Sequence, residues 1–479
     1  MPTNEPNGAE QLRLFDQPDA DPDDEPGRPA AADAGAGPEP PTPAPEPGEQ
    51  PEPAGPSPVQ ESSAVPGVEE FGRRRRPEPQ GSFERDETDE LDDFHDELRK
   101  SARRTRRSEP TRDQAEIALQ RWHEALQVEG ESLRFVSNAG RTGIVAHEWL
   151  VARYGAMVMP AVLESPQVWE ITGGHRVLRV LSFQDTSVPL EPGRWVLETD
   201  IHAQYLAAAH STNLGDGEPT HHLDAAALAE ADQVKMTRCP GYVRLAAAPD
   251  LSELPGHVQG AFAPAEAGWW VPTPLAAYLV RDCGLRLQLD EAIVWHERLV
   301  DGRTQRAYGT RLARWAKVFV AGRERLMLAE HAGDATAGLA VGVVKACYST
   351  FLGGLLRSTR HNDTATLRPD WNDQIVATGG ANMLRALDKA VAAGARPLGA
   401  AKDAAWWVTD EHVHAPDGLV VTGATSERPF QPGKWHLDRR APVDEQLAAA
   451  HRTGSAARFL KALIAADDER AAAQQEGTQ

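Results

Sequence analysis

The chain has 479 residues, enough for two or three domains, and a formal net charge of −21. Residues 1–110 hold 27 acidic and 13 basic residues, a net charge of −14, whereas residues 111–479 hold 44 and 37, a net charge of −7. The three cysteines form no CxxC pair, so the sequence excludes a disulfide framework. The N-terminus has no signal pattern and no apolar run reaches 18 residues, so we expect a soluble intracellular protein without a membrane partner.

Residues 1–110 are predicted to form a disordered tail. Seventeen of the 37 prolines lie within the first 66 residues. Such a segment buries too little apolar surface to offset its conformational entropy. An acidic block followed by a basic block occupies residues 83–107. This pattern is typical of a solvated charged linker, but also of a transient helix or of a contact with a nucleic-acid backbone.

One short apolar motif interrupts the polar tail at residues 11–15, with the sequence Gln-Leu-Arg-Leu-Phe. An isolated motif of this kind is typical of a docking peptide, whose apolar side chains fill a pocket while the glutamine hydrogen-bonds at its rim. It resembles the QLxLF peptide by which bacterial replication and repair proteins hold the sliding clamp. The partner-binding residues would be Gln11, Leu12, Leu14 and Phe15.

The rest of the chain alternates between helical patterns and short strands. Helices are predicted over 113–127, 147–154, 310–330, 336–352 and 381–393, and strands over 169–180, 194–198, 396–401 and 404–408. The strand over 169–180 contains the pair Gly173-Gly174, and the turn between the last two strands contains Asp403. Helices beside antiparallel hairpins, without a regular βαβ alternation, predict the α+β class.

The helix predicted over 310–330 has a basic face. At 100° per residue, one side carries Arg311, Arg314, Lys317 and Arg325, and the opposite side is apolar. Four cations without an acid between them suit a polyanion such as DNA, although a solvated basic face would have the same pattern. Arg323 falls within the apolar side, which is unfavourable unless an anion meets it.

Asp200 follows an apolar strand, and Tyr205 opens the next helix. Alone, a strand-end aspartate is usually a turn or cap residue. Three stretches together, however, resemble the motifs of a family B DNA polymerase. They are Asp200-Ile-His-Ala-Gln-Tyr205-Leu (family pattern Asp-x-x-Ser-Leu-Tyr-Pro), Lys345-Ala-Cys-Tyr-Ser-Thr-Phe-Leu-Gly353 (Lys-x-x-x-Asn-Ser-x-Tyr-Gly) and Gly399-Ala-Ala-Lys-Asp403-Ala (Tyr-Gly-Asp-Thr-Asp-Ser).

Three shorter stretches extend the likeness over residues 165–437. Ile171-Thr-Gly173-Gly174 resembles the stretch that contacts template and primer, and Gly268–Leu275 resembles a further palm segment. Gln431-Pro-Gly-Lys434-Trp435 resembles the entry to the thumb. The resemblance implies that Gly173, Gly174 and Lys434 contact DNA, together with Arg311, Arg314 and Lys317 of the basic helix.

The resemblance implies template-directed transfer of a nucleotide from a dNTP to a DNA primer. Asp200 and Asp403 would hold two Mg²⁺ ions, with Mn²⁺ as the alternative ion. A competing register places the second carboxylate at Asp410; the spacing from the preceding helix favours Asp403. Other roles follow from the resemblance: Lys345, with Arg323 or Arg325, would neutralise the triphosphate charge, and Tyr205 would exclude a 2′-hydroxyl.

The implied organisation is a polymerase-like palm with helical fingers and a small thumb. Its boundaries are 1–110 for the tail, 111–198 for a reduced N-terminal region, 199–304 and 357–430 for the palm, 305–356 for the fingers and 431–479 for the thumb-like region. We expect a clamp-tethered monomer in the cytoplasm, associated with the nucleoid.

Two departures from the family pattern keep other functions open. No exonuclease motif precedes the palm, so proofreading is expected to be absent, and Ala401 stands where the hairpin motif has its first aspartate. The alternatives to an active polymerase are a polymerase-derived DNA-binding factor for replication or repair with little or no synthesis, and an unrelated α+β protein.

Overall fold

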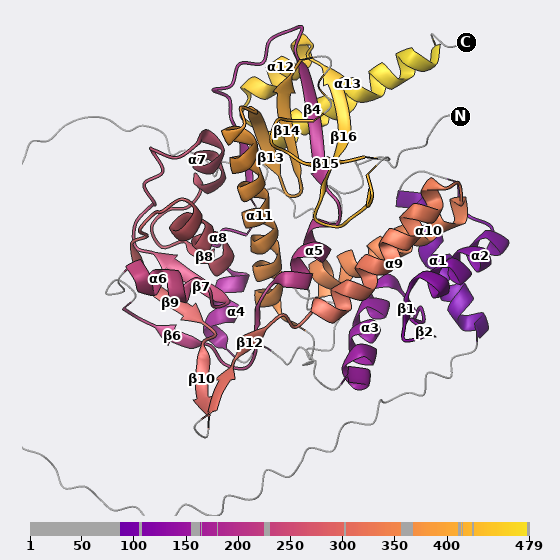
Figure 1. Cartoon of the computed structure of the whole chain (residues 1–479), viewed down its shortest axis with the longest axis horizontal. Coiled ribbons are helices and arrows are strands. Elements are labelled where there is room, and N and C mark those ends of the chain that lie inside the picture. The colour runs from indigo at the N-terminus through magenta and orange to yellow at the C-terminus, as the bar shows by residue number, and fades with distance from the viewer. Residues whose placement is uncertain are drawn as a thin grey trace, which may run out of the picture. The chain divides into compact units, whose positions relative to one another are not determined.

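A computed structural model describes most of the chain beyond the tail. The described residues are 87–104, 108–154, 163, 165–179, 181–224, 230–300, 303–355, 367–410, 413, 415–423 and 426–476. Helices stand beside largely antiparallel sheets, so the predicted α+β class is confirmed (Figure 1). The motif at residues 11–15 lies outside the described residues.

The central sheet has six strands in the order β15-β16-β4-β14-β13-β3. Their bounds are Val421–Thr422 (β15), Trp435–Pro442 (β16), Trp195–Ile201 (β4), Ala404–Thr409 (β14), Pro397–Ala401 (β13) and Ser182–Gln184 (β3). Neighbouring strands are antiparallel except for the β15–β16 pair, which is parallel. The predicted strand, turn and strand around Asp403 are therefore present as β13, a two-residue turn and β14.

The remaining strands form a four-stranded sheet in the order β6-β9-β7-β8 and three two-stranded ribbons. The sheet contains β6 (Thr220–His222), β9 (Leu289–Val294), β7 (Gly241–Leu245) and β8 (Trp270–Pro272). The ribbons pair β1 (Gln127–Val128) with β2 (Glu131–Ser132), β5 (Leu214–Gly215) with β12 (Tyr308–Gly309), and β10 (Glu297–Val300) with β11 (Arg303–Arg306).

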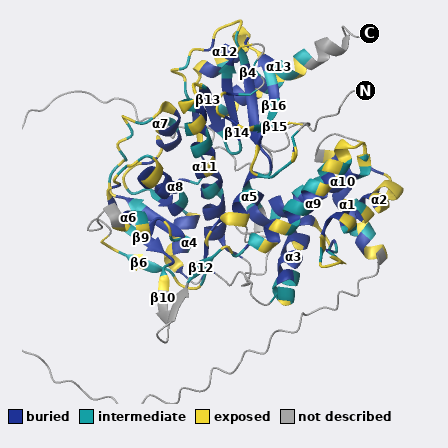
Figure 2. Cartoon of the chain, viewed as in Figure 1, coloured by how far each residue is buried: buried dark blue, intermediate teal, exposed yellow. Residues whose placement is uncertain are grey.

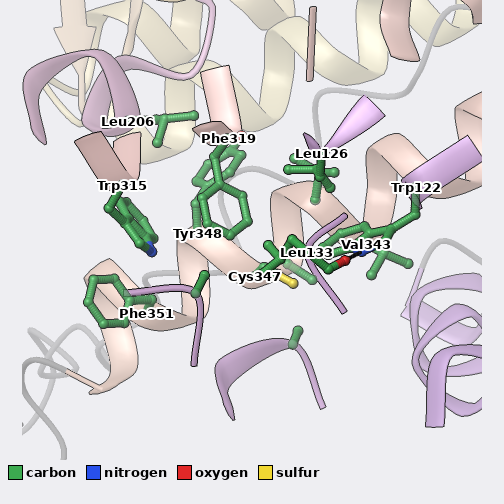
Figure 3. Close-up of a cluster of buried hydrophobic side chains, with 14 of the residues drawn as sticks. Trp122, Leu126, Leu133, Leu206, Trp315, Phe319, Val343, Cys347, Tyr348 and Phe351 are labelled. Carbon is green, nitrogen blue, oxygen red and sulfur yellow. Dashed lines mark hydrogen bonds between the residues drawn. The ribbon is translucent and has the colours of Figure 1, made fainter. Parts of the chain in front are cut away.

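One apolar core is formed mainly by helices of the N-terminal region and the predicted fingers, with contributions from α5 (Gln204–Ser211) and α11 (Pro369–Ala392). The main helices are α1 (Glu87–Arg104), α2 (Arg112–Ala125), α3 (Ala139–Tyr154), α9 (Ala313–His331) and α10 (Ala335–Ser349), which continues into a π-helix over Thr350–Leu355. Figure 3 shows this core: Phe319 of α9 and Tyr348 of α10 lie beside Leu206 at one end, and Trp122 of α2 lies at the other end near Val343. The core therefore joins the chain's first helices to the predicted fingers.

The other helices pack on or between the sheets. They are α4 (Pro166–Gly173), α5 (Gln204–Ser211), α6 (Glu230–Met236), α7 (Gly256–Phe262), α8 (Thr273–Ala277) with a π-helix over Tyr278–Asp282, α11 (Pro369–Ala392), α12 (Glu445–Arg452) and α13 (Ala456–Glu476). Leu384 and Leu387 of α11 share a core cluster with Leu197 and Trp407 of the central sheet and with Val243 of the second sheet. Helix α11 thus links the two sheets.

Strand β4 is buried along both faces (Figure 2). Val196 packs in a cluster with residues of α12 and α13, and Leu197 packs in the cluster of α11. Side chains alternate between the faces of a strand, so Glu198 and Asp200 lie on the same face as Val196. Two carboxylates on a strand without a solvent-exposed face require partners or a ligand.

Two sequence-based expectations were wrong. Residues 87–104 lie within the predicted disordered tail, yet they form α1, whose Phe94 is fully buried against Trp122 and whose Glu90 accepts a hydrogen bond from the amide of Phe135. The many charged residues of this segment made its buried apolar residues, Phe94, Leu98 and Ala102, hard to recognise as a helix face. The strand predicted over 169–180 begins instead as helix α4, because Ser165 caps its N-terminus and Pro166 suits its first turn.

By length and composition, one helical segment in the described part of the chain could cross a membrane, over Ala335–Gly353. Of that window, 56% is buried inside the protein. The segment packs against α2, α3 and α9. Its apolar character is therefore accounted for by its place in the core.

Candidate active site

The end of β4 and the β13–β14 turn bring two predicted site residues together. Asp200 pairs with Ala404 across the two antiparallel strands, so Asp403 is one residue beyond this pair. The amide of Ile201 donates to the carbonyl oxygen of Asp403 at 3.0 Å, which extends the pairing into the turn. Lys402 has a φ of 58°, a left-handed conformation that a two-residue turn requires. The turn therefore fixes Asp403 beside Asp200.

One of the two carboxylates, that of Asp200, has an oxygen without a polar partner. Asp200 is 3% exposed, and its buried Oδ1 has no hydrogen-bond partner. Burial, followed by the negative charge of Asp403, raises the pKa of Asp200 well above its usual value. Burial also raises the pKa of Asp403, whereas the positive charge of Lys345 lowers it. Buried like charges with an unpartnered oxygen are stabilised by a bound cation.

The structure adds a carboxylate that the sequence reasoning missed. Asp438 of β16 lies close enough to raise the pKa values of both Asp200 and Asp403 through its charge. Its own carboxylate is paired with Arg439, with 2.8 Å between Oδ2 and Nη1. In the sequence, Asp438 and Arg439 are visible as an adjacent acid and base. Their position beside Asp200 depends on the pairing of β16 with the distant strand β4.

Two cations of the predicted fingers approach this site. Lys345 of α10 lowers the pKa values of Asp403 and Asp438, so its ammonium lies near both carboxylates. Arg323 of α9 is 8% exposed and donates to the backbone carbonyl of Phe430 at 3.1 Å. Arg323 also hydrogen-bonds with Tyr348 and holds the pKa of that phenol down against the effect of burial. The sequence placed Arg323 on the apolar side of its helix. In the structure its guanidinium bonds to the carbonyl of Phe430 and to Tyr348.

Two tyrosines lie next to the carboxylates. Burial, then the charges of Asp403 and Asp200, raise the pKa of Tyr205, which opens α5 directly after the Asp200 strand. Tyr348 is subject to the charges of the same two aspartates. Tyr348 was not among the predicted site residues, although it follows Lys345 by three positions and therefore lies on the same helix face.

A pair of stacked histidines lines the same strand end. The rings of His202 and His436 are parallel within 3°, with centroids 3.7 Å apart. His436 pairs with Asp200 across β16 and β4. Burial lowers the pKa of His202 to about 2 and that of His436 to about 4, and the positive charge of Arg323 adds to both effects. Both rings are therefore neutral near pH 7, and neither offsets the charge of the aspartates.

Several predicted site residues lie elsewhere. Asp410 forms a surface ion pair with Arg194 at the opposite end of β14, so of the two alternatives only Asp403 adjoins Asp200. Arg325 donates to the carbonyl of Ala125 on α2 at 2.8 Å rather than approaching the aspartates.

The predicted DNA contacts are also spread over the surface. Arg311 precedes α9 and pairs with Asp216, while Arg314 stacks on the ring of Tyr154 at 4.3 Å. Lys317 is exposed on α9, and Lys434 is exposed just before β16. The glycine pair closes α4: Gly173 is its last residue, and Gly174 is its C-cap. The basic face is thus only partly helical, because the helix begins two residues after Arg311.

The carboxylates fit divalent cations that are bound together with a substrate. Across the described ranges, no group of three or more His, Cys, Asp or Glu side chains is arranged to hold a metal ion. Mg²⁺, however, is commonly bound by one or two carboxylates together with substrate phosphates. The unpartnered Oδ1 of Asp200 and the adjacent Asp403 provide such a pair.

No protein-family model matches the chain, and no curated protein matches it. Among solved structures, Phi29 DNA polymerase in complex with primer-template DNA and incoming nucleotides is similar with a TM-score of 0.40 and 12% identity, over 68% of this chain and 55% of that one. For the orthorhombic crystal form of Phi29 DNA polymerase the TM-score is 0.39 and the identity 10%, over 64% of this chain and 53% of that one. The chain spans about half the length of these structures. The similarity is distant and concerns the fold.

Proposed function

We propose that this chain is a DNA-directed DNA polymerase that transfers nucleotides from dNTPs to a primer end and lacks proofreading. The observation that carries the proposal is that Asp200, near the end of β4, adjoins Asp403 in the β13–β14 turn, with an unpartnered oxygen on Asp200 and with Lys345 near Asp403. Phosphoryl transfer needs little covalent chemistry from a protein; it needs positioned anions for metal ions and positioned cations for the triphosphate.

Asp200 and Asp403 are the residues that would hold two Mg²⁺ ions, or Mn²⁺ in their place. When bound, such ions lower the pKa of the primer hydroxyl and neutralise charge on the triphosphate. Lys345 and Arg323 then meet the triphosphate from the side of α10 and α9. Tyr205 lies near both aspartates, and its ring would exclude a 2′-hydroxyl.

The proposal includes contacts with the DNA backbone and with a bacterial sliding clamp. Lys317 and Lys434 are exposed and carry the charge that phosphate contacts use. The motif at residues 11–15 would hold the clamp and keep the monomeric enzyme at a high effective concentration near the primer end.

Primer extension tests the proposal. Wild-type protein is incubated with primer–template DNA, dNTPs and Mg²⁺ or Mn²⁺, beside Asp200→Ala, Asp403→Ala and Asp410→Ala. We expect extension by the wild type and by Asp410→Ala, whose carboxylate lies at the far end of β14, and loss of extension in the other two variants. Equal extension by Asp200→Ala and the wild type would refute the assigned site.

A second function, a DNA-binding factor without synthesis, is favoured by one observation. The hairpin strand β13 ends in Ala401, so this strand supplies no carboxylate to the site. Such a factor would bind primer–template DNA with the affinity of a polymerase and extend no primer with either ion. Binding measured by fluorescence anisotropy, beside the extension assay, separates the two functions.

A further inference from the structure

Strand β13 ends in Ala401 and so supplies no charged side chain to the row beside Asp200. A cross-strand row runs from Ala401 through Ala404 to Asp200 and on to His436 of β16. On the hairpin side of Asp200, the strands β14 and β13 therefore present two alanines in this row. The other neighbour of Asp200, strand β16, is where a further carboxylate is found.

A β-bulge brings that carboxylate to the site. Along β16, Leu437 pairs with Thr199 and Arg439 pairs with Glu198, so Asp438 is an extra residue between them. A bulge of this kind turns the extra side chain out of the regular alternation. Arg439 shows the result, because its Nη1 lies 2.8 Å from Asp438 Oδ2 and 2.7 Å from Glu198 Oε2. Asp438 therefore lies on the Glu198 face of the sheet, which is also the face of Asp200.

Several charged groups surround Asp438. One guanidinium, that of Arg439, is shared between Asp438 and Glu198. Asp200 and Asp403 add two further carboxylates, and the positive charges of Lys345 and Lys402 act on Asp403. The charge of Asp438 acts on both aspartates, and the charge of Lys345 acts on Asp438. The side chain of Asp438 is only 16% exposed, so water screens its interactions with these charged groups weakly. Together with the unpartnered Oδ1 of Asp200, this arrangement points to a bound cation.

We propose, on the basis of the function proposed above, that Asp438 is the third carboxylate of the site and supplies the cation-binding charge that Ala401 does not. Strand β16, which leads to the thumb-like region, thus supplies a negative charge to the site where strand β13 supplies none. Asp438 acts on the ions through its charge, beside Asp200 and Asp403, which would hold them, and Arg439 positions it.

Binding of Mn²⁺ to the full chain, measured by electron paramagnetic resonance with a dNTP present and without DNA, tests this role. Asp438→Asn should weaken Mn²⁺ binding about 10- to 100-fold, as is usual when a residue supporting a metal site is lost. The matched control, Asp410→Asn, should bind as the wild type does. If Asp438→Asn binds like the wild type while Asp200→Asn loses binding, Asp438 has no such role and the proposed function stands. A wild type that neither binds Mn²⁺ nor extends a primer would overturn both.

Thermal unfolding and a compensating variant separate cation binding from folding. A purely structural role of Asp438 would lower the Tm of Asp438→Asn equally in EDTA and in Mn²⁺. A role in cation binding instead reduces the rise in Tm that Mn²⁺ produces. In Asp438→Asn, the added substitution Ala401→Asp places a carboxylate at the end of β13 and should recover Mn²⁺ affinity. If the double variant binds Mn²⁺ as weakly as Asp438→Asn does, the proposal that Asp438 supplies the charge absent at Ala401 is contradicted.

Discussion

Arg439 and Glu198 form an ion pair inside the central sheet, with 2.7 Å between Nη1 and Oε2 and both side chains almost fully buried. Burial raises the pKa of Glu198, and the positive charge of Arg439 opposes this effect. Removing the guanidinium would leave Glu198 and Asp438 without their shared partner. We expect Arg439→Met to lower the free energy of unfolding by about 3–5 kcal/mol, the usual effect of breaking a buried pair on one side. Urea unfolding followed by circular dichroism measures the change.

Arg194→Met is the matched control for this substitution. Arg194 pairs with Asp410 at 3.2 Å on the surface, where the two side chains are 43% and 75% exposed. Exposed pairs contribute about 0–1 kcal/mol, so the control should unfold nearly as the wild type does. If both variants lose a similar free energy of unfolding, burial does not determine how much the Arg439 ion pair contributes to stability.

His147 of α3 is predicted to make stability depend on pH. Its side chain is 1% exposed, and burial lowers its pKa to about 4. In the unfolded chain the imidazole takes up a proton near pH 6.5. Its contribution to stability is therefore complete above pH 6.5 and is lost as the pH falls toward 4. By pH 5 the loss should reach about 2 kcal/mol.

Comparing variants at pH 7 and pH 5 isolates this effect from that of other buried histidines. The wild type should lose about 2 kcal/mol more between the two pH values than His147→Leu does. His175→Leu, at an exposed position, is the control and should show the wild-type dependence. An unchanged dependence in His147→Leu would show that this imidazole is already protonated or solvated in the folded protein.

The sequence predicted the local parts of the site well. The turn carrying Asp403 followed from its two short apolar strands, and the helix bearing Lys345 followed from its periodicity. The choice between Asp403 and Asp410 depended on spacing, and the pairing of β14 with β4 places only Asp403 beside Asp200. Whether these residues are catalytic is a matter for the extension assay.

The rest of the site depends on contacts between distant segments. Asp438 joins it through a bulge, and no periodicity in the sequence indicates an extra residue in one strand of a pair. Arg325 and Arg323 are two positions apart, and only tertiary packing shows that one bonds to α2 while the other reaches Phe430. Helix α1 was missed because its charged residues outnumber its few buried apolar ones.

The tail motif at residues 11–15 is predicted to bind the sliding clamp. Leu14→Ala combined with Phe15→Ala removes the two side chains expected to fill the clamp's pocket. The variant should lose capture by an immobilised bacterial clamp while retaining the wild-type Tm. Arg13→Ala, at the variable position of the motif, is the control and should be captured. Undiminished capture of the double variant would exclude this motif as the contact.

Lys345 is predicted to act on the incoming nucleotide. Its charge already acts on Asp403 and Asp438, so a triphosphate bound with cations at these carboxylates would meet the ammonium directly. Lys345→Ala should lower kcat/KM for dNTP in primer extension about 100-fold, the order expected when one positioned charge is removed from a phosphoryl-transfer site. Lys345→Arg should recover part of the loss because it keeps the charge.

Lys317→Ala is the control for the effect on the nucleotide. Lys317 is exposed on α9, and its loss should weaken primer–template binding in a salt-dependent way while leaving the KM for dNTP unchanged. If Lys345→Ala instead weakens DNA binding and leaves the KM for dNTP unchanged, Lys345 contacts the nucleic acid backbone. The carboxylates would then lack a cation for the triphosphate on α10, and Arg323 would have to supply that charge alone.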